Sequence, residues 1–328
     1  MAQGPDIDGV LVQWGDRLFY PGNRMVHARQ QPRLKALTNA LKTAQRAAAI
    51  RQRIAATVVR RAPQVMVKVT GGGRGMRAIA AHFRYISKSG RLDIEDERGE
   101  TQRGKDALPG LVDDWRYGGT LIEDTAEPGQ RREAFNIMLS MPRGTDPLLV
   151  QRAAREFAQT ELADHKYVMV LHDHQANPHV HISVRAESKH GKRLNPRKAD
   201  LHRWRETFAE KLRGYGIEAE ATRQATRGVL RRFPELWQVK AQQDGRLRNL
   251  RSSTSPNAQP KTTLEEAVES WARIGQTLAA SASAADRDLA RSVAVFVREM
   301  TTADSMSARA RVPEFASSQK AVEADVRR

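Results

Sequence analysis

The chain has 328 residues, of which 55 are Lys or Arg and 38 are Asp or Glu, so its formal net charge is +17 at pH 7. A positive surplus of this size indicates a polyanionic partner, either nucleic acid or an acidic membrane surface. The absence of cysteine excludes disulfides and thiolate metal sites. Since no stretch resembles a secretory signal or a membrane span, we expect a cytoplasmic protein.

Residues 1–62 are basic, and we expect them to form a helical extension at the N-terminus of the main domain. From Leu34 to Ile54, apolar residues recur at near-helical spacing, with Lys and Arg residues between them. Residues 1–60 carry ten Lys or Arg residues against three Asp residues. Such a helix would lie on DNA or on the main domain, and a helix exposed to solvent is the alternative.

Residues 63–235 are expected to form the main domain, because β-rich runs alternate there with segments of helical periodicity. The expected strands cover residues 64–70, 135–141, 167–171 and 180–185. The expected helices cover residues 74–88, 147–163 and 198–213. The last two strands are separated by the turn-forming sequence Gln175-Ala176-Asn177-Pro178, which makes them antiparallel neighbours. The pattern therefore predicts an α+β fold with a central antiparallel sheet and flanking helices.

The composition changes after the main domain. Ser, Pro, Asn and Thr are concentrated in residues 252–263, so we expect a linker over residues 236–263. Residues 264–300 have helical periodicity. With a final stretch that we expect to be disordered, they complete a predicted C-terminal region of residues 264–328.

Four of the nine histidines lie between His172 and His181. His179 and His181 are two residues apart on an expected strand, so their side chains share a face. His172 ends the preceding strand, and the turn brings it beside that pair. Three imidazoles on adjacent strands would bind a divalent metal and leave coordination positions open for a substrate. We expect Mg²⁺ or Mn²⁺, with Zn²⁺ as a further candidate; imidazole ligands favour the transition metals.

Tyr85 lies near the end of the expected helix 74–88. His82 and Lys88 are three residues before and after it, so all three share a face. A phenol is a weak nucleophile because its pKa is about 10, and it needs a nearby cation or base. Arg84, Lys88 and the metal would supply positive charge. A tyrosine of the core or of an amphipathic surface is the alternative.

Three motifs in this order resemble those of single-tyrosine relaxases of the HUH endonuclease class, in particular Vir-type border endonucleases and P-family mobilisation relaxases. Residues 83–90, around Tyr85, resemble the first motif, whose tyrosine is the nucleophile. Residues 139–146 resemble the second motif, which places Ser140 at the nick-site DNA. His172, six further residues and then His179-Val180-His181 resemble the third motif. Further similarity to the segment downstream of these motifs is found in residues 191–195, 205–209 and 225–228.

The resemblance implies the HUH fold and a metal-dependent relaxase, which nicks and rejoins one DNA strand at a transfer origin to initiate conjugation or plasmid mobilisation. Tyr85 would attack the scissile phosphate and form a phosphotyrosine intermediate, while His172, His179 and His181 hold the ion. The implied partners are single-stranded and duplex DNA, with accessory DNA-processing and coupling proteins of a bacterial conjugation system. The protein would act in the cytoplasm or be exported with the transferred strand.

One position departs from the family pattern, which often has Asp two residues after the first histidine. This chain has His174 there and Asp173 one position earlier, so both are candidates to hydrogen-bond the metal ligands. Further basic residues are expected to contact the DNA backbone. They are Arg74, Arg84 and Lys88 around the tyrosine, and Lys192, Arg193, Arg197 and Lys198, which follow the second histidine strand directly.

Other functions remain open on the sequence. A rolling-circle replication initiator or a transposase would use the same chemistry. A catalytically idle, DNA-binding relaxosome accessory protein would need neither the tyrosine nor the histidines. A plain metallophosphoesterase would form no covalent adduct with DNA.

Overall fold

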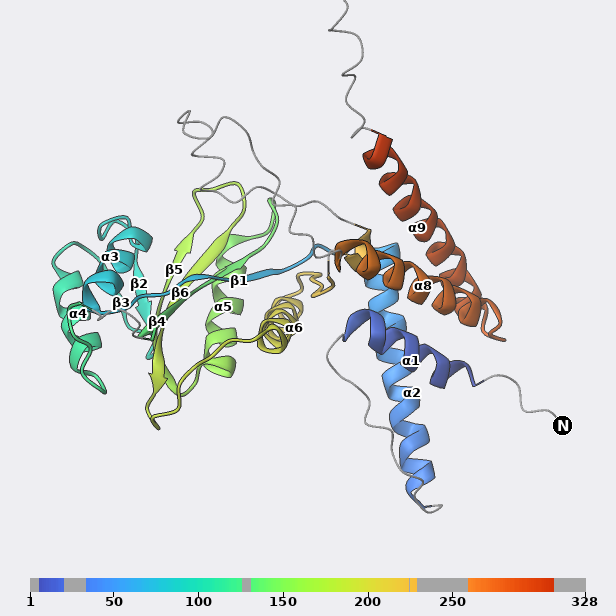
Figure 1. The fold of residues 1–328 in the computed structure, drawn as a ribbon, viewed down its shortest axis with the longest axis horizontal. Helices are drawn as coiled ribbons and strands as arrows, with labels where there is room; N and C mark the ends of the chain where they lie inside the picture. The colour runs from blue at the N-terminus through green and yellow to red at the C-terminus, as the bar shows by residue number, and fades with distance from the viewer. Residues whose placement is uncertain (1–5, 21–33, 126–130, 224, 229–258, 310–328) are drawn as a thin grey trace, which may run out of the picture. The chain divides into compact units, whose positions relative to one another are not determined.

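The computed structural model describes residues 6–20, 34–125, 131–223, 225–228 and 259–309, and these divide into two compact units (Figure 1). The sheet unit comprises Arg61–Ala221, and the helical unit comprises Met1–Arg60 together with Thr222–Arg328. The two units are described separately below.

The sheet unit is built on six strands in the order β1-β4-β6-β5-β2-β3. Every pair of neighbouring strands is antiparallel. The strands are β1 Met66–Gly71, β2 Ile94–Asp96, β3 Thr101–Gln102, β4 Ala134–Ser140, β5 His165–His172 and β6 His179–Ser188. The predicted α+β class with a central antiparallel sheet is confirmed.

One face of the sheet is covered by α5 (Pro147–Glu161) and α6 (Lys198–Gly214), which lie together on one side of it in Figure 1. Helix α5 begins after Asp146, whose side chain accepts hydrogen bonds from two backbone amides of the first turn. Phe157, Trp204 and Phe208 are fully buried in this layer, in edge-to-face contact, and form one core with the inward-facing residues of β6.

The other face is covered only in part, by α3 (Met76–Ile86) and α4 (Ala107–Tyr117). Phe83 and Trp115 meet edge to face at 4.8 Å and pack with Val168 and Val170 of β5. Strand β6 alternates strictly, so its apolar residues face α5 and α6 while His179, His181 and the next odd-numbered residues face the α3 side.

An ion pair and two backbone hydrogen bonds hold parts of the sheet unit together. Arg155 of α5 forms a bidentate ion pair with Glu95 of β2, whose side chain is buried. At the ends of the unit, the Val65 amide donates to the Glu220 carbonyl at 3.0 Å, and the Glu220 amide donates to the Pro63 carbonyl at 2.9 Å. The entry and the exit of the chain are therefore joined.

The helical unit has a core of its own, made by helices from both ends of the chain. Its elements are α1 Ile7–Phe19, α2 Leu34–Ile54, the π-helical turn η1 Ala55–Val59, η2 Ala225–Arg227, α8 Gln259–Ala279 and α9 Ala284–Arg309. Trp271 of α8 is fully buried against Phe19 and Phe296, and its indole N–H donates to the Thr226 carbonyl at 2.8 Å. Gly15 of α1 allows a close approach to α2, because a Cβ there would lie 2.6 Å from Ile50 Cγ2.

The N-terminal segment that we expected to be an extension thus packs against α8 in one unit. Residues 236–258 of the expected linker and residues 310–328 of the expected C-terminal region lie outside the described residues. Among the helices that the structure describes, none has the length and apolar character needed to cross a membrane.

Candidate active site

The three predicted metal ligands meet at one end of the central strand pair. His172, the last residue of β5, is paired with His179, the first residue of β6, and His181 follows on the same face. One ring nitrogen from each lies within 4.8 Å of the others, and all three side chains are buried. The ring centroids are separated by 4.7 to 5.0 Å. We call these residues the histidine triad.

Backbone carbonyls orient two of the three rings. The Nε2–H group of His172 donates to the carbonyl of Ile86 at 2.7 Å, and the Nδ1–H group of His179 donates to the carbonyl of Asn177 at 2.9 Å. A carbonyl can only accept, so each bonded nitrogen carries the hydrogen and the opposite nitrogen keeps a lone pair. The Nδ1 atoms of His172 and His181 are buried without a hydrogen-bond partner. Unpaired imidazole lone pairs gathered in one place fit a transition-metal ion.

Burial also favours the neutral form of two of the three imidazoles. Burial, with smaller contributions from the neighbouring imidazoles of His172, His179 and His82, lowers the pKa of His181 to about 3. Desolvation likewise lowers the pKa of His172. The neutral imidazole is the form that binds metals, so these rings need not lose a proton at neutral pH before they bind one.

The two residues considered as partners of the ligands lie in the exposed turn after β5. The ring of His174 is 5.1 Å from the ring of His172. No hydrogen bond joins Asp173 to an imidazole of the triad within the described part of the chain. The carbonyls of Ile86 and Asn177 make those hydrogen bonds instead, and a backbone partner leaves no signal in a sequence motif.

Tyr85 lies beside the triad on the last turn of α3. Its side chain is 67% exposed, and its ring centroid is 6.4 Å from that of His181. His82, one turn earlier, stacks on Tyr85 at 6.1 Å, and its Nε2 atom is buried without a hydrogen-bond partner. Burial lowers the pKa of His82 to about 4. The phenol is thus accessible to a substrate, whereas the imidazole next to it is neutral.

A strained turn holds the end of α3 against the triad. Lys88, Ser89 and Gly90 all have positive φ angles, of 51°, 59° and 83°. The Ser89 amide donates to the Arg84 carbonyl at 2.7 Å, and the Gly90 amide donates to the Ser87 hydroxyl at 3.0 Å. The same turn positions the Ile86 carbonyl that accepts from His172. The helix that carries the tyrosine is therefore joined directly to the histidine triad through His172.

The basic and polar residues expected near the tyrosine fall into two groups. Ser140 is paired with His179 across β4 and β6 and is buried on the triad face, while Arg84 and Lys88 are exposed at the end of α3. The charge of Lys88 reaches the triad, because it lowers the pKa of His172. Arg74 precedes the N-terminal end of α3. At a rise of about 1.5 Å per residue, it lies about 16 Å from Tyr85 along the helix axis.

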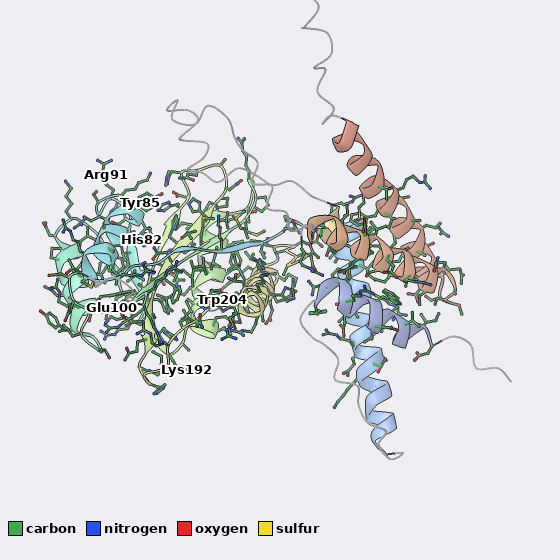
Figure 2. The ribbon with its side chains drawn as sticks, viewed as in Figure 1. His82, Tyr85, Arg91, Glu100, Lys192 and Trp204 are labelled. Atoms are coloured by element: carbon green, nitrogen blue, oxygen red, sulfur yellow. The ribbon has the colours of Figure 1, made fainter. Side chains whose placement is uncertain are left out.

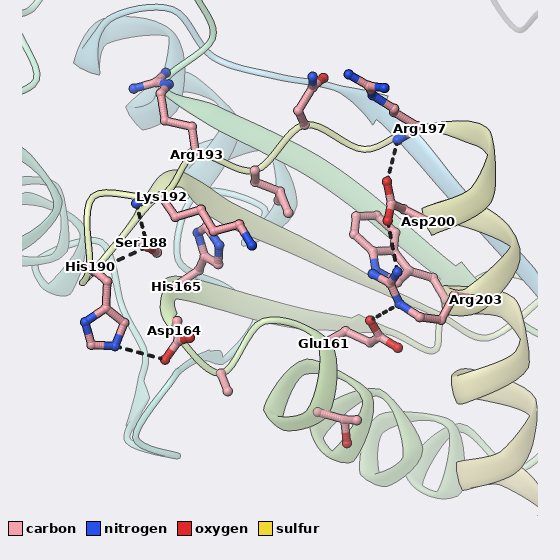
Figure 3. Close-up of a pocket in the computed structure, with 15 residues that line it drawn as sticks. Glu161, Asp164, His165, Ser188, His190, Lys192, Arg193, Arg197, Asp200 and Arg203 are labelled. Atoms are coloured by element: carbon pink, nitrogen blue, oxygen red, sulfur yellow. Dashed lines mark hydrogen bonds and ion pairs between the residues drawn. The ribbon is translucent and has the colours of Figure 1, made fainter.

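Lys192, Arg193, Arg197 and Lys198 are not next to the triad, contrary to the expectation from their sequence position. They follow the far end of β6, whose length is about 30 Å at about 3.3 Å per residue. Figure 2 shows Lys192 and Tyr85 at opposite ends of the sheet. Three of these four basic residues line a separate pocket of about 490 Å³ that also contains Glu161, Asp164 and Asp200 (Figure 3). Arg193 is ion-paired there with Glu133 and Glu187.

The antiparallel sheet presents the triad and Tyr85 together, an arrangement that fits a nuclease domain. Residues 111–217 match the family model for relaxases, described as MobA/VirD2-like, nuclease domain. The chain therefore carries a MobA/VirD2-like relaxase nuclease domain, which nicks DNA in mobilisation. The matched segment contains Ser140 and the triad, whereas Tyr85 precedes it. A search of curated proteins found no match.

Proposed function

We propose that the protein nicks and rejoins one DNA strand at a transfer origin by metal-dependent tyrosine transesterification, and so initiates conjugative or mobilisation transfer. One observation carries the proposal: the exposed ring of Tyr85 lies 6.4 Å from the ring of His181, in a buried triad where two imidazoles have unpaired nitrogens. A nucleophile and a metal site this close can act on the same phosphate.

His172, His179 and His181 would hold a divalent ion, Mg²⁺ or Mn²⁺ with Zn²⁺ as a further candidate. When bound, this ion would neutralise charge on the phosphoryl oxygens. The hydrogen bonds from His172 to Ile86 and from His179 to Asn177 hold the rings in the tautomers that leave their other nitrogens available as ligands.

Tyr85 would supply the nucleophilic oxygen. As the bond from that oxygen to phosphorus forms, the phenol loses its proton and the bond from phosphorus to the 3′ oxygen breaks. The products are a 5′-phosphotyrosyl enzyme and a free 3′-OH, which takes up a proton. One phosphodiester replaces another, so the reverse reaction can rejoin the strand. The exposed cations Arg84 and Lys88 would bind the DNA backbone beside it.

The adduct itself provides the test. The full chain is incubated with Mn²⁺ and single-stranded DNA from its own transfer origin, and products are separated in SDS. Wild type should form an SDS-stable adduct, and Tyr85→Phe should not. Tyr117→Phe is the matched control, because Tyr117 is also 67% exposed. An adduct that persists in Tyr85→Phe, or cleavage without any adduct, would contradict the proposal; the latter result indicates a metallophosphoesterase.

Metal binding can be tested without cleavage. Mn²⁺ should raise the melting temperature of the wild type, because a ligand that binds only the folded state stabilises it. At a concentration one hundred times its Kd, a ligand contributes about 2.7 kcal/mol. His179→Ala should abolish most of this shift, and His190→Ala, far from the triad, should retain it. Equal shifts in both variants would show that the triad does not bind the ion.

The basic N-terminal residues would contact duplex DNA beside the nick, where accessory DNA-processing and coupling proteins also assemble. Removing them is a poor test, because α1 and α2 share a core with α8. Lys42 of α2 is exposed and can be replaced by Ala. The slope of log affinity for duplex DNA against log salt should then fall by about 0.9. An unchanged slope would argue against this contact.

A further inference from the structure

The triad face of the sheet is covered on one side of the triad and open on the other. Toward β5, helices α3 and α4 bury Val168 and Val170 completely. Toward β1, Met66 is 50% exposed, and Lys68 and Thr70 are also exposed. On β4, between these two regions, Asn136 and Met138 are half-buried. We call Met66, Lys68, Thr70, Asn136 and Met138 the open ledge.

Strand register connects the open ledge to the triad in rows. Residues directly opposite each other on paired strands share a face. One row therefore runs from His179 through Ser140 to Met66, and the next runs from His181 through Met138 to Lys68. A DNA strand bound at the triad cannot continue across β5, because α3 covers that side. The open ledge is the continuous exposed surface beside it.

The third row carries a fixed amide. Ser183, fully buried on β6, donates its hydroxyl hydrogen to Asn136 Oδ1 at 3.0 Å. On the other side, Asn136 is paired with Gly71, where a Cβ would lie 3.9 Å from Asn136 Nδ2. Because Gly71 has no side chain, the amide nitrogen is open toward β1. The hydroxyl of Ser183 thus orients the amide, and Gly71 leaves it accessible.

The position of Asn136 suits contact with a nucleotide near the nick. It is one strand and two residues away from His181, which is about 8 Å for strands about 4.8 Å apart with a rise of about 3.3 Å per residue. Two to three stacked nucleotides span that distance, at about 3.4 Å each. A carboxamide offers two donors and an acceptor, and unpaired bases expose their hydrogen-bonding edges.

We propose that the open ledge binds the single DNA strand next to the scissile phosphate and that Asn136 determines base preference at one position of the nick site. Lys68 lies along this path and binds the DNA backbone, while the thioethers of Met66 and Met138 contact base faces. The inference rests on the proposed function, since it takes the triad as the place where the strand is cut.

Base preference in binding tests the role of Asn136. Full-length protein is mixed with a pool of single-stranded DNA that has a randomised window of about a dozen nucleotides, and bound strands are sequenced. Wild type should enrich one base at one position about 10-fold or more, since a well-placed amide contact contributes about 1–3 kcal/mol of discrimination. Asn136→Ala should reduce the enrichment to about 3-fold or less. Gln102→Ala, an amide on β3 at the opposite sheet edge, should leave it unchanged.

A second variant retains the amide but blocks access to it. Gly71→Leu should place a side chain over Asn136 Nδ2 and cause the same loss of preference. Thermal melts confirm that each variant is folded. If both folded variants keep the wild-type preference, Asn136 does not read a base. The adduct assay separates this outcome from failure of the proposed function, because Tyr85-dependent adducts would still form.

The proposed path of the DNA backbone over the open ledge is tested separately, through the salt dependence of binding. Lys68→Ala should reduce the salt dependence of single-strand binding by about 0.7 on the log–log scale, whereas Lys105→Ala, an exposed lysine on the loop before α4, should not. Equal slopes in the two variants would overturn the assignment of the open ledge as the binding surface.

Discussion

Acidification should destabilise the sheet unit through His82. Burial lowers the pKa of this imidazole from 6.5 to about 4. The unfolded chain, with the ordinary pKa, therefore binds more protons than the folded chain between these two values. Stability rises with pH wherever the unfolded state binds more protons. The contribution of a neutral His82 is thus complete above pH 6.5 and is lost progressively as the pH falls toward 4.

The size of the effect follows from the two pKa values. At pH 5, the unfolded imidazole is almost wholly protonated and the folded one almost wholly neutral. The gap of about one and a half units between the unfolded pKa of 6.5 and pH 5 corresponds to about 2 kcal/mol, at about 1.36 kcal/mol per unit. Screening by solvent at the partly exposed ring reduces this to about 1–2 kcal/mol. For a unit of this size, the melting temperature should fall by roughly 3 to 6 °C.

Thermal melts of the full chain at pH 8 and pH 5, with chelator present, measure this loss. Between pH 8 and pH 5, the free energy of unfolding of His82→Gln should fall by about 1–2 kcal/mol less than that of the wild type. The other buried histidines are present in both proteins, so most of their contribution cancels; His82 is the smallest of the causes that lower the pKa of His181. His190→Gln, whose side chain is 67% exposed, should behave as wild type. If His82→Gln loses as much stability as wild type, the imidazole is not held neutral by burial.

Three further substitutions probe the packing of the two units by chemical denaturation. Arg155→Ala should cost about 3 kcal/mol, because it leaves the buried carboxylate of Glu95 without its partner, and replacing Glu95 by Gln as well should recover part of the loss. Gly15→Ala should destabilise the helical unit by about 1–3 kcal/mol, since its methyl group would overlap Ile50. Trp271→Phe should cost about 1–3 kcal/mol through loss of the buried indole hydrogen bond. Effects below about 0.5 kcal/mol would contradict each assignment.

The α+β fold and the triad could be predicted because their signals are local. Residues 179–185 alternate between polar and apolar, which fixes the face of each side chain before any partner strand is known. The short turn after His172 then forces the hairpin that brings the triad together. Strands β2 and β3 were not predicted, because runs of three and two residues have no readable period. Helix α4 was missed because Pro109 and Gly110 lie in its first turn, where a proline is tolerated.

Other features depend on contacts between distant parts of the chain, which periodicity does not show. Lys192 follows β6 closely in sequence, yet the length of that strand carries it about 30 Å from the triad. The carbonyls of Ile86 and Asn177 orient the ligand rings, and every residue has a carbonyl. Asn136 is one polar residue in a strand, and only its register with Ser183 and Gly71 shows that its amide is oriented and accessible.

The two hydrogen bonds that join Glu220 to Pro63 and Val65 close the ends of the sheet unit, which is inserted in the chain between the two segments of the helical unit. Its residues are contiguous, so during synthesis it can be complete once residue 221 has left the ribosome. The helical unit is completed later, because its core combines Phe19 and Ile50 with Trp271 of α8. Early termination of translation would therefore release a finished sheet unit attached to two amphipathic helices that lack the cover of α8, a species prone to aggregation.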